Sequence, residues 1–83
     1  MCEFTYIVTD EDGIHARPAG ALVNFAKGFA EDITVYKGEK KADAKRLMAV
    51  MSLGAKKGDT LRIVVDGDRQ VMDKVKAFFE KNF

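Results

Sequence analysis

Hydrophobic and polar residues alternate at the start of the chain and then change to a wider spacing. Phe4, Tyr6 and Val8 alternate with polar residues, which is the period-two pattern of a strand with one buried face. An acidic turn follows at residues 10–13. From Ala16 the apolar residues recur at the spacing of one helix face, at Ala19, Leu22, Val23, Ala26 and Phe29. The first part of the chain therefore predicts a strand, a turn and an amphipathic helix.

The ends of three helices can be placed from single residues. Pro18 suits the first turn of the first helix, where its missing N–H costs nothing, and Gly28 marks the region of that helix's C-terminal end. A second, short helix is expected from about residue 44 to 53, because Gly54 stops it. Asp68 is suited to cap the last helix, whose apolar side carries Val71, Val75, Phe78, Phe79 and Asn82.

Residues 33–36, 40–42 and 60–66 predict three more strands. The strand at 40–42 is short and highly charged, as strands at the edge of a sheet often are. The resulting order is βαββαβα, and this proportion of strand and helix predicts an α+β domain with helices packed on one face of a sheet. The open face of such a small sheet has to be polar, and suitable residues are Glu3, Thr5, Thr9, Thr34 and Arg62.

Composition and charge exclude several classes of protein. A chain of 83 residues supports one hydrophobic core, so we expect a single domain over residues 1–83. The net charge of +1 creates no global field that would attract nucleic acid. A single cysteine excludes the small secreted domains that disulfides hold together. The chain has neither a membrane-spanning apolar stretch nor a secretion signal at its start, so we expect a cytoplasmic protein.

The only histidine, His15, lies in a turn immediately before the first helix. The first N–H groups of a helix have no partner and carry the positive end of its dipole, so an anion is stabilised there. The same field disfavours an imidazolium, and we expect His15 to stay neutral with a nucleophilic ring nitrogen. Arg17 can hold a phosphate with two parallel hydrogen bonds. These residues favour a phosphoryl group carried on histidine. The alternative is a solvated loop histidine or a weak helix cap, with Arg17 a surface charge.

Both predicted helices before residue 54 also carry residues that a folded core does not require. Opposite its apolar stripe the first helix has Arg17, Gly20, Asn24 and Lys27. A glycine on an exposed helix face costs about 0.5–1 kcal/mol relative to alanine, which is tolerable where another surface approaches closely. The alternative is that Gly20 packs internally or is simply tolerated.

In the second helix Leu47, Val50 and Met51 suffice as a core stripe, yet Met48 projects about 100° away from Leu47. Exposed methionines suit a surface that binds several partners, because their side chains are flexible and polarisable. The alternative is that both methionines fill the core.

Other kinds of site find no support in the sequence. His15 and Cys2 do not make a metal-ligand set, and we expect no metal site. The glycines match neither nucleotide-binding motif. His15 has no obvious acid partner for hydrolytic catalysis, and the basic residues are spread along the chain without a stacking platform for nucleic acid.

Residues 13–19, Gly-Ile-His-Ala-Arg-Pro-Ala, resemble the active-site segment of HPr, the histidine-containing phosphocarrier family of the bacterial phosphoenolpyruvate-dependent sugar phosphotransferase system. Residues 48–54, Met-Ala-Val-Met-Ser-Leu-Gly, resemble that family's second-helix segment. The resemblance runs from end to end. It implies an open-faced β-sandwich, in which four antiparallel strands in the order 1-4-2-3 carry three helices on one face.

The resemblance also implies roles for individual residues. His15 would be phosphorylated on Nδ1, and Arg17 and the amides of Ala16 and Arg17 would bind the phosphoryl group. The surface that meets enzyme I and the sugar-specific IIA proteins would include Gly20, Leu47, Met48 and Met51, and we add Asn24 and Lys27 from the same face of the first helix. Such a protein is a cytoplasmic, monomeric carrier without a cofactor or direct membrane insertion, not an enzyme with its own turnover.

One residue departs from the family. Many relatives have a serine that a regulatory kinase phosphorylates where this chain has Arg46, so that switch is expected to be missing. A second hypothesis is therefore kept beside the carrier: an HPr-like regulatory module whose phosphorylation state signals to a partner instead of driving sugar transport. Both His15 and Arg17 are present, which favours the carrier.

Overall fold

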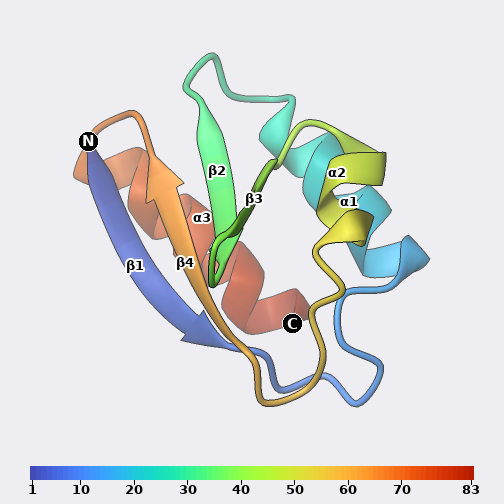
Figure 1. The fold of residues 1–83 in the computed structure, drawn as a ribbon. Coiled ribbons are helices and arrows are strands. Elements are labelled where there is room, and N and C mark those ends of the chain that lie inside the picture. The colour runs from blue at the N-terminus through green and yellow to red at the C-terminus, as the bar shows by residue number, and fades with distance from the viewer.

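Four strands and three helices follow one another in the predicted order βαββαβα (Figure 1). The structure, a computed structural model, describes all residues 1–83. The strands are β1 (Cys2–Ile7), β2 (Ile33–Lys37), β3 (Lys40–Asp43) and β4 (Thr60–Val65). The helices are α1 (Ala16–Ala26), α2 (Leu47–Ser52) and α3 (Arg69–Asn82). The predicted sequence of elements is confirmed.

The strands form one antiparallel sheet in the order β1-β4-β2-β3. This is the strand order that the family resemblance implied. Ile63 of β4 lies between Phe4 of β1 and Val35 of β2, so the register aligns the alternating apolar positions of neighbouring strands. Figure 1 shows α3 running behind β1 and β4, while α1 and α2 lie side by side at the β3 end of the sheet.

The core lies between the sheet and the helices. Phe79 of α3 is fully buried and meets the rings of Phe4 and Tyr6 edge-on, with both centroid distances 5.9 Å. Phe25 of α1 stacks on Phe78 of α3 at 4.3 Å and so joins the two long helices. No charged or polar residue is buried. Each aromatic contact adds to the area that the side chains bury, which is the main stabilising contribution in a domain of this size.

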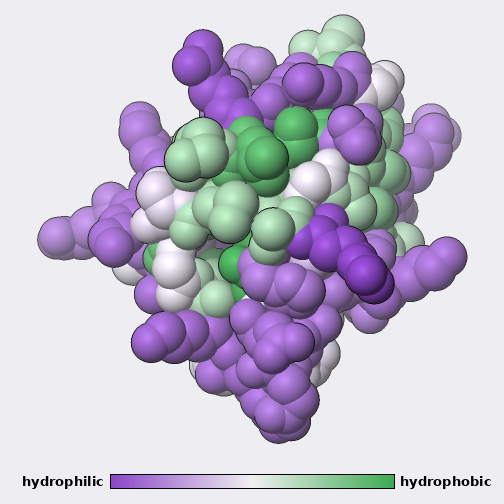
Figure 2. Space-filling model, turned by 90° about the vertical axis from the view of Figure 1, so that its right-hand side faces the viewer, coloured by the Kyte–Doolittle hydropathy of each residue, from purple (hydrophilic) through white to green (hydrophobic).

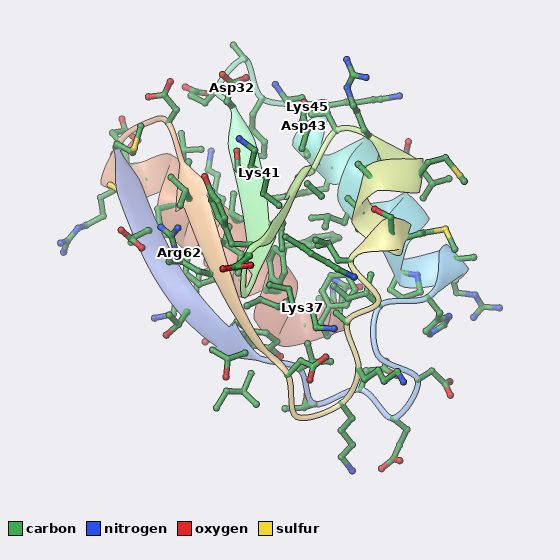
Figure 3. All side chains as sticks on the ribbon, viewed as in Figure 1. Asp32, Lys37, Lys41, Asp43, Lys45 and Arg62 are labelled. Carbon is green, nitrogen blue, oxygen red and sulfur yellow. The ribbon has the colours of Figure 1, made fainter.

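The opposite face of the sheet is open and polar, as predicted. Arg62 of β4 donates to Glu3 Oε2 of β1 at 3.2 Å and lies 4.2 Å above the ring of Tyr36 of β2 (Figure 3). These side chains link three strands on the solvent side. Because they are exposed, we expect each contact to add only a few tenths of a kcal/mol.

Helix α2 begins later than the sequence predicted. The apolar pattern placed its start near Ala44, whereas α2 spans Leu47–Ser52. The N–H of Ala44 instead donates to the carbonyl of Ile33 at 2.8 Å, which continues the pairing of the edge strand. The Asp43 carboxylate then accepts the N–H of Lys45 at 2.9 Å and closes a turn. Arg46 then has an extended backbone (φ −121°, ψ 111°), so α2 cannot begin before Leu47.

A glycine fixes the segment that leads to the site. Gly13 has φ +66°, and a Cβ there would overlap the carbonyl of Ala55 in the loop between α2 and β4. The next residue, Ile14, donates its N–H to the same carbonyl at 3.0 Å. The acidic turn is therefore held against this loop, and both the glycine and the loop position the start of α1.

Candidate functional site at the start of α1

His15 is the N-cap residue of α1, but its side chain does not cap the helix. Its backbone is extended (φ −113°, ψ −176°), and its carbonyl accepts the N–H of Ala19 at 2.9 Å. The imidazole makes no hydrogen bond to the helix and is partly exposed. The interpretation of His15 as a weak helix cap is therefore wrong, and its ring nitrogens are available for chemistry.

The helix start offers donors beside the imidazole. The N–H groups of Ala16 and Arg17 donate to no atom of the protein, as expected for the first turn of a helix, and Pro18 has no N–H. The Arg17 guanidinium is exposed and makes no ion pair. Two free amides, the positive end of the helix dipole and one free cation thus surround the position next to His15, an arrangement that stabilises a bound anion.

A shallow hollow of about 350 Å³ opens beside these groups. It is lined by Asp10, His15, Arg17, Pro18, Ala21, Lys81 and Asn82. The last two come from the end of α3 and were not expected in the site. Their position follows from contacts of the final residue, because the N–H groups of Thr9 and Asp10 donate to the Phe83 carbonyl at 2.7 and 2.9 Å. Such long-range pairing leaves no local signal in the sequence.

Two carboxylates lie close to His15, which its sequence neighbours alone did not predict. Oxygen atoms of Asp10 and Asp12 and a ring nitrogen of His15 all lie within 4.8 Å of one another. This spacing is one at which three side chains could share a metal ion, whereas sequence analysis considered only His15 with Cys2. The turn created by Gly13 folds the acidic residues back toward the helix start, which linear spacing alone does not show.

The residues predicted to meet partners lie on α1 and α2, which contact one another. In α2 the exposed fraction of Met48 is 78 %, that of Leu47 is 40 % and that of Met51 is 37 %, and only Val50 is buried. The expectation that Leu47 and Met51 belong to a core stripe is therefore wrong, as is the alternative that both methionines fill the core. Figure 2 shows apolar atoms gathered in the middle of this face with hydrophilic atoms around them. We call Leu47, Met48 and Met51 the apolar patch.

The face of α1 beside the apolar patch carries small and polar residues. Arg17, Asn24 and Lys27 are exposed. A Cβ placed on Gly20 would meet nothing within 4 Å, so this glycine does not pack internally. The predicted partner residues of the two helices therefore lie at the surface, and at Gly20 no side chain projects from this surface.

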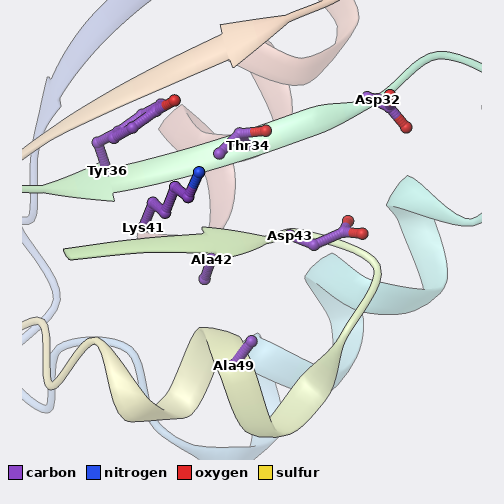
Figure 4. Close-up of a pocket in the computed structure, with 7 residues that line it drawn as sticks. All are labelled: Asp32, Thr34, Tyr36, Lys41, Ala42, Asp43 and Ala49. Carbon is purple, nitrogen blue, oxygen red and sulfur yellow. The ribbon is translucent and has the colours of Figure 1, made fainter.

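A second hollow, of about 390 Å³, lies at the β3 edge of the sheet (Figure 4). Two cross-strand pairs, Thr34 with Asp43 and Tyr36 with Lys41, supply most of its polar groups. Its charged side chains are of both signs and it contains no histidine. None of the predicted site residues lines it, whereas His15 and Arg17 both line the hollow at the start of α1.

The loop that holds Gly13 is itself fixed by charge. Lys37 Nζ lies 3.3 Å from Asp59 Oδ2 and donates to the carbonyls of Leu53 and Gly54 at 3.3 and 3.1 Å, at the end of α2 (Figure 3). The hydrogen bond from the Lys56 N–H, at 2.9 Å, and the nearby Lys37 ammonium lower the pKa of Asp59 below its usual value of 3.8.

Comparison with known proteins gives the family. Residues 2–81 match the model of the PTS-HPr family, described as "PTS HPr component phosphorylation site". Phosphocarrier protein HPr of Mycoplasma capricolum subsp. capricolum is 40 % identical over 68 residues, which cover 82 % of this chain and 76 % of that protein. The chain belongs to the HPr family. It is accordingly a phosphoryl carrier of the phosphotransferase system.

Solved structures of HPr proteins agree with this assignment. HPr-C-His from Thermoanaerobacter tengcongensis is 34 % identical and matches with a TM-score of 0.90, covering 100 % of this chain and 96 % of that one. HPr from Bacillus anthracis strain Ames is 29 % identical, with a TM-score of 0.84 and coverage of 94 % and 95 %. The fold expected from the resemblance is confirmed. No helix in the structure has the length and apolar character needed to cross a membrane.

Proposed function

We propose that this carrier holds the phosphoryl group on Nδ1 of His15, receives it from enzyme I and passes it to the sugar-specific IIA proteins. One observation supports this most strongly: the imidazole makes no cap and stands beside the two free amides of Ala16 and Arg17 and the free Arg17 guanidinium. These donors favour an anionic group next to a nucleophilic ring nitrogen.

The transfer exchanges one bond to phosphorus for another. The lone pair of the His15 ring nitrogen forms the new N–P bond while the bond between phosphorus and the donor breaks, and that electron pair remains on the donor. The amides of Ala16 and Arg17 and the Arg17 side chain stabilise the phosphoryl oxygens during this step. Transfer to the acceptor reverses the step and restores the free imidazole. The protein thus acts as a stoichiometric carrier in the cytoplasm, needs no cofactor and works as a monomer.

The docking surface in this proposal is the apolar patch together with Gly20, Asn24 and Lys27. It lies on the two helices that pack together beside the site, so a partner seated there reaches His15 from the exposed start of α1. Exposed methionines adapt to different partner surfaces, which suits a protein that meets a donor and several acceptors in turn. The basic side chains around the patch add attraction to acidic partner surfaces.

Phosphorylation by enzyme I tests the proposal. Incubation with enzyme I and phosphoenolpyruvate is expected to add one acid-labile phosphoryl group, seen as a single increment in intact mass. His15→Ala should abolish the increment while the thermal unfolding transition stays close to that of the wild type, because the imidazole makes no hydrogen bond to the helix. Phosphorylation that persists in His15→Ala would place the nucleophile elsewhere and refute the proposal.

A further inference from the structure

Two carboxylates lie close to the imidazole of His15, and this inference rests on the phosphorylation of that residue in the proposed function. Asp10 is held in place, because its Oδ1 accepts the N–H of Asp12 at 2.9 Å and its own N–H donates to the carbonyl of Phe83 at 2.9 Å. Oxygens of both carboxylates lie within 4.8 Å of a ring nitrogen of His15. Neither residue contributes to the binding of an anion, since both carry the same sign of charge as a phosphoryl group.

Asp10 and Asp12 form no ion pair, although Lys81 and Arg17 line the same hollow as Asp10. The ion pairs of the structure use four other acidic residues, and neither of these two takes part in one. Glu11, which lies between them in the sequence, does pair with a cation, because its Oε1 accepts from Lys57 Nζ. Asp10 and Asp12 thus lie close to His15 without an ion pair, whereas Glu11 is paired with Lys57.

We propose that Asp10 and Asp12 raise the phosphoryl-transfer potential of His15 by destabilising its phosphorylated form. Two unit charges of like sign about 5 Å apart change an equilibrium constant by about fourfold even at the dielectric constant of water. The free imidazole carries no negative charge and does not feel this repulsion. Arg17 and the amides bind the transferred group, and the carboxylates oppose that binding, so the group leaves readily for an acceptor. The arrangement suits a carrier, which has to release its cargo.

The equilibrium of transfer from enzyme I measures this effect directly. The equilibrium constant depends on the free proteins at the start and end of the reaction, so a change in docking alters the rate and leaves the constant unchanged. We expect Asp12→Asn and Asp10→Asn each to shift the constant about three- to tenfold toward the phosphorylated carrier. Asparagine at residue 10 retains an oxygen that accepts the N–H of Asp12. The phosphorylated fraction of each protein is read by intact mass.

Glu11→Gln is the matched control. It removes the same charge from the same turn, but from a carboxylate that pairs with Lys57, and we expect the equilibrium constant to stay within about twofold of the wild type. Raising the salt concentration from 0.05 to about 1 M shortens the screening length to about 3 Å. The shifts of Asp10→Asn and Asp12→Asn should therefore shrink at high salt, which an effect of altered structure would not do.

The outcomes separate this inference from the proposed function. If the wild type takes up a phosphoryl group on His15 and the two Asn variants leave the equilibrium constant unchanged, only the role of the carboxylates is refuted. A shift in Glu11→Gln as large as in Asp12→Asn, or a shift that persists in high salt, would refute it as well. If His15 in the wild type takes up no phosphoryl group, the proposed function fails and this inference fails with it.

Discussion

The conformation of single residues decides what His15 can do. Its extended backbone starts α1 without using the imidazole as a cap, so the side chain stays free while the carbonyl accepts the N–H of Ala19. Gly13, two residues earlier, turns the chain with φ +66° close to the carbonyl of Ala55. The position of His15 therefore depends on Gly13, a residue without a side chain.

A substitution at Gly13 should show this dependence. Gly13→Ala adds both a left-handed strain and an overlap with the Ala55 carbonyl, so we expect it to lower the free energy of unfolding by about 2–4 kcal/mol. Gly38→Ala is the matched control, because Gly38 has φ +59° and open space around its Cβ position. It should cost only about 1–2 kcal/mol. Urea unfolding measures both, and equal losses would show that the close approach to Ala55 is unimportant.

At the scale of elements, α2 is a short helix with few buried side chains. Only Val50 is buried, and the apolar patch on its other sides is exposed. The helix is anchored by its ends: the edge strand leads into it, and the Lys37 ammonium binds the carbonyls of Leu53 and Gly54 where it stops. A helix held in this way can present apolar side chains to a partner without losing its place in the fold.

A charge in the apolar patch tests its role in docking. Met48→Glu should weaken binding to enzyme I at least about tenfold, because the carboxylate would be buried without a partner at the interface. The thermal unfolding transition should be unchanged, since Met48 is 78 % exposed. Ala77→Glu, which places the same charge on an exposed position of α3, is the control and should bind like the wild type. Unchanged affinity of Met48→Glu in a titration with enzyme I would exclude Met48 from the interface.

The N-cap of α2 is Arg46, at the position where the family resemblance led us to expect a regulatory serine. Its side chain makes no cap hydrogen bond and only a long, exposed contact of 4.0 Å with Asp43. We expect an HPr serine kinase with ATP to leave the wild type unmodified, because Arg46 offers no hydroxyl group. Arg46→Ser should accept phosphate from the kinase and also raise the free energy of unfolding by about 0.5–1 kcal/mol through a better cap.

Mass spectrometry and urea unfolding follow the two effects of Arg46→Ser separately. The only serine of the wild type, Ser52, lies at the C-terminal end of α2. Its hydroxyl donates to the Ala49 carbonyl at 2.7 Å, and the helix dipole disfavours a phosphate there. Efficient phosphorylation of the wild type at Ser52 would show that the regulatory switch has moved within the chain, contrary to the expectation.

At the scale of the whole molecule, the site is held together by contacts between distant parts of the chain. The acidic turn binds the loop before β4 through Ile14 and binds the last residue, Phe83, through Thr9 and Asp10. Asp59 fixes that loop by accepting from the Lys56 N–H and pairing with Lys37. A change in this loop should therefore reach the start of α1.

The pH dependence of stability should reflect Asp59. Its pKa is lower in the folded protein than the usual 3.8, so its contribution to stability is complete above pH 3.8 and is lost as the pH falls through the folded value below it. Asp59→Asn should flatten the fall in the free energy of unfolding in this acid range while lowering stability at neutral pH. Urea unfolding from pH 7 to pH 2 measures the slopes. Parallel slopes for the two proteins would contradict the assignment of the shift to Asp59.

Much of the fold and the centre of the site could be predicted from sequence, and the reasons are local. Period-two and helical spacing located the elements, Asp68 was correctly expected to cap α3, and its carboxylate accepts the Val71 N–H at 3.1 Å. The position of His15 before a helix start follows from the same patterns. The start of α2 was placed too early, because Ala44 still pairs with β2 and Arg46 is extended, and neither feature leaves a local signal in the sequence.

The sequence by itself determined the order of the elements. It also determined that His15 lies directly before a helix with Arg17 in its first turn, because both features depend on residues close together in the chain. Only the tertiary structure decided that Leu47 and Met51 stay at the surface and that Asp10 and Asp12 turn toward His15. The exposure of a side chain depends on how much of a short helix the core can cover. The approach of the carboxylates depends on a turn held by Ala55 and Phe83, which lie more than 40 residues away in the chain.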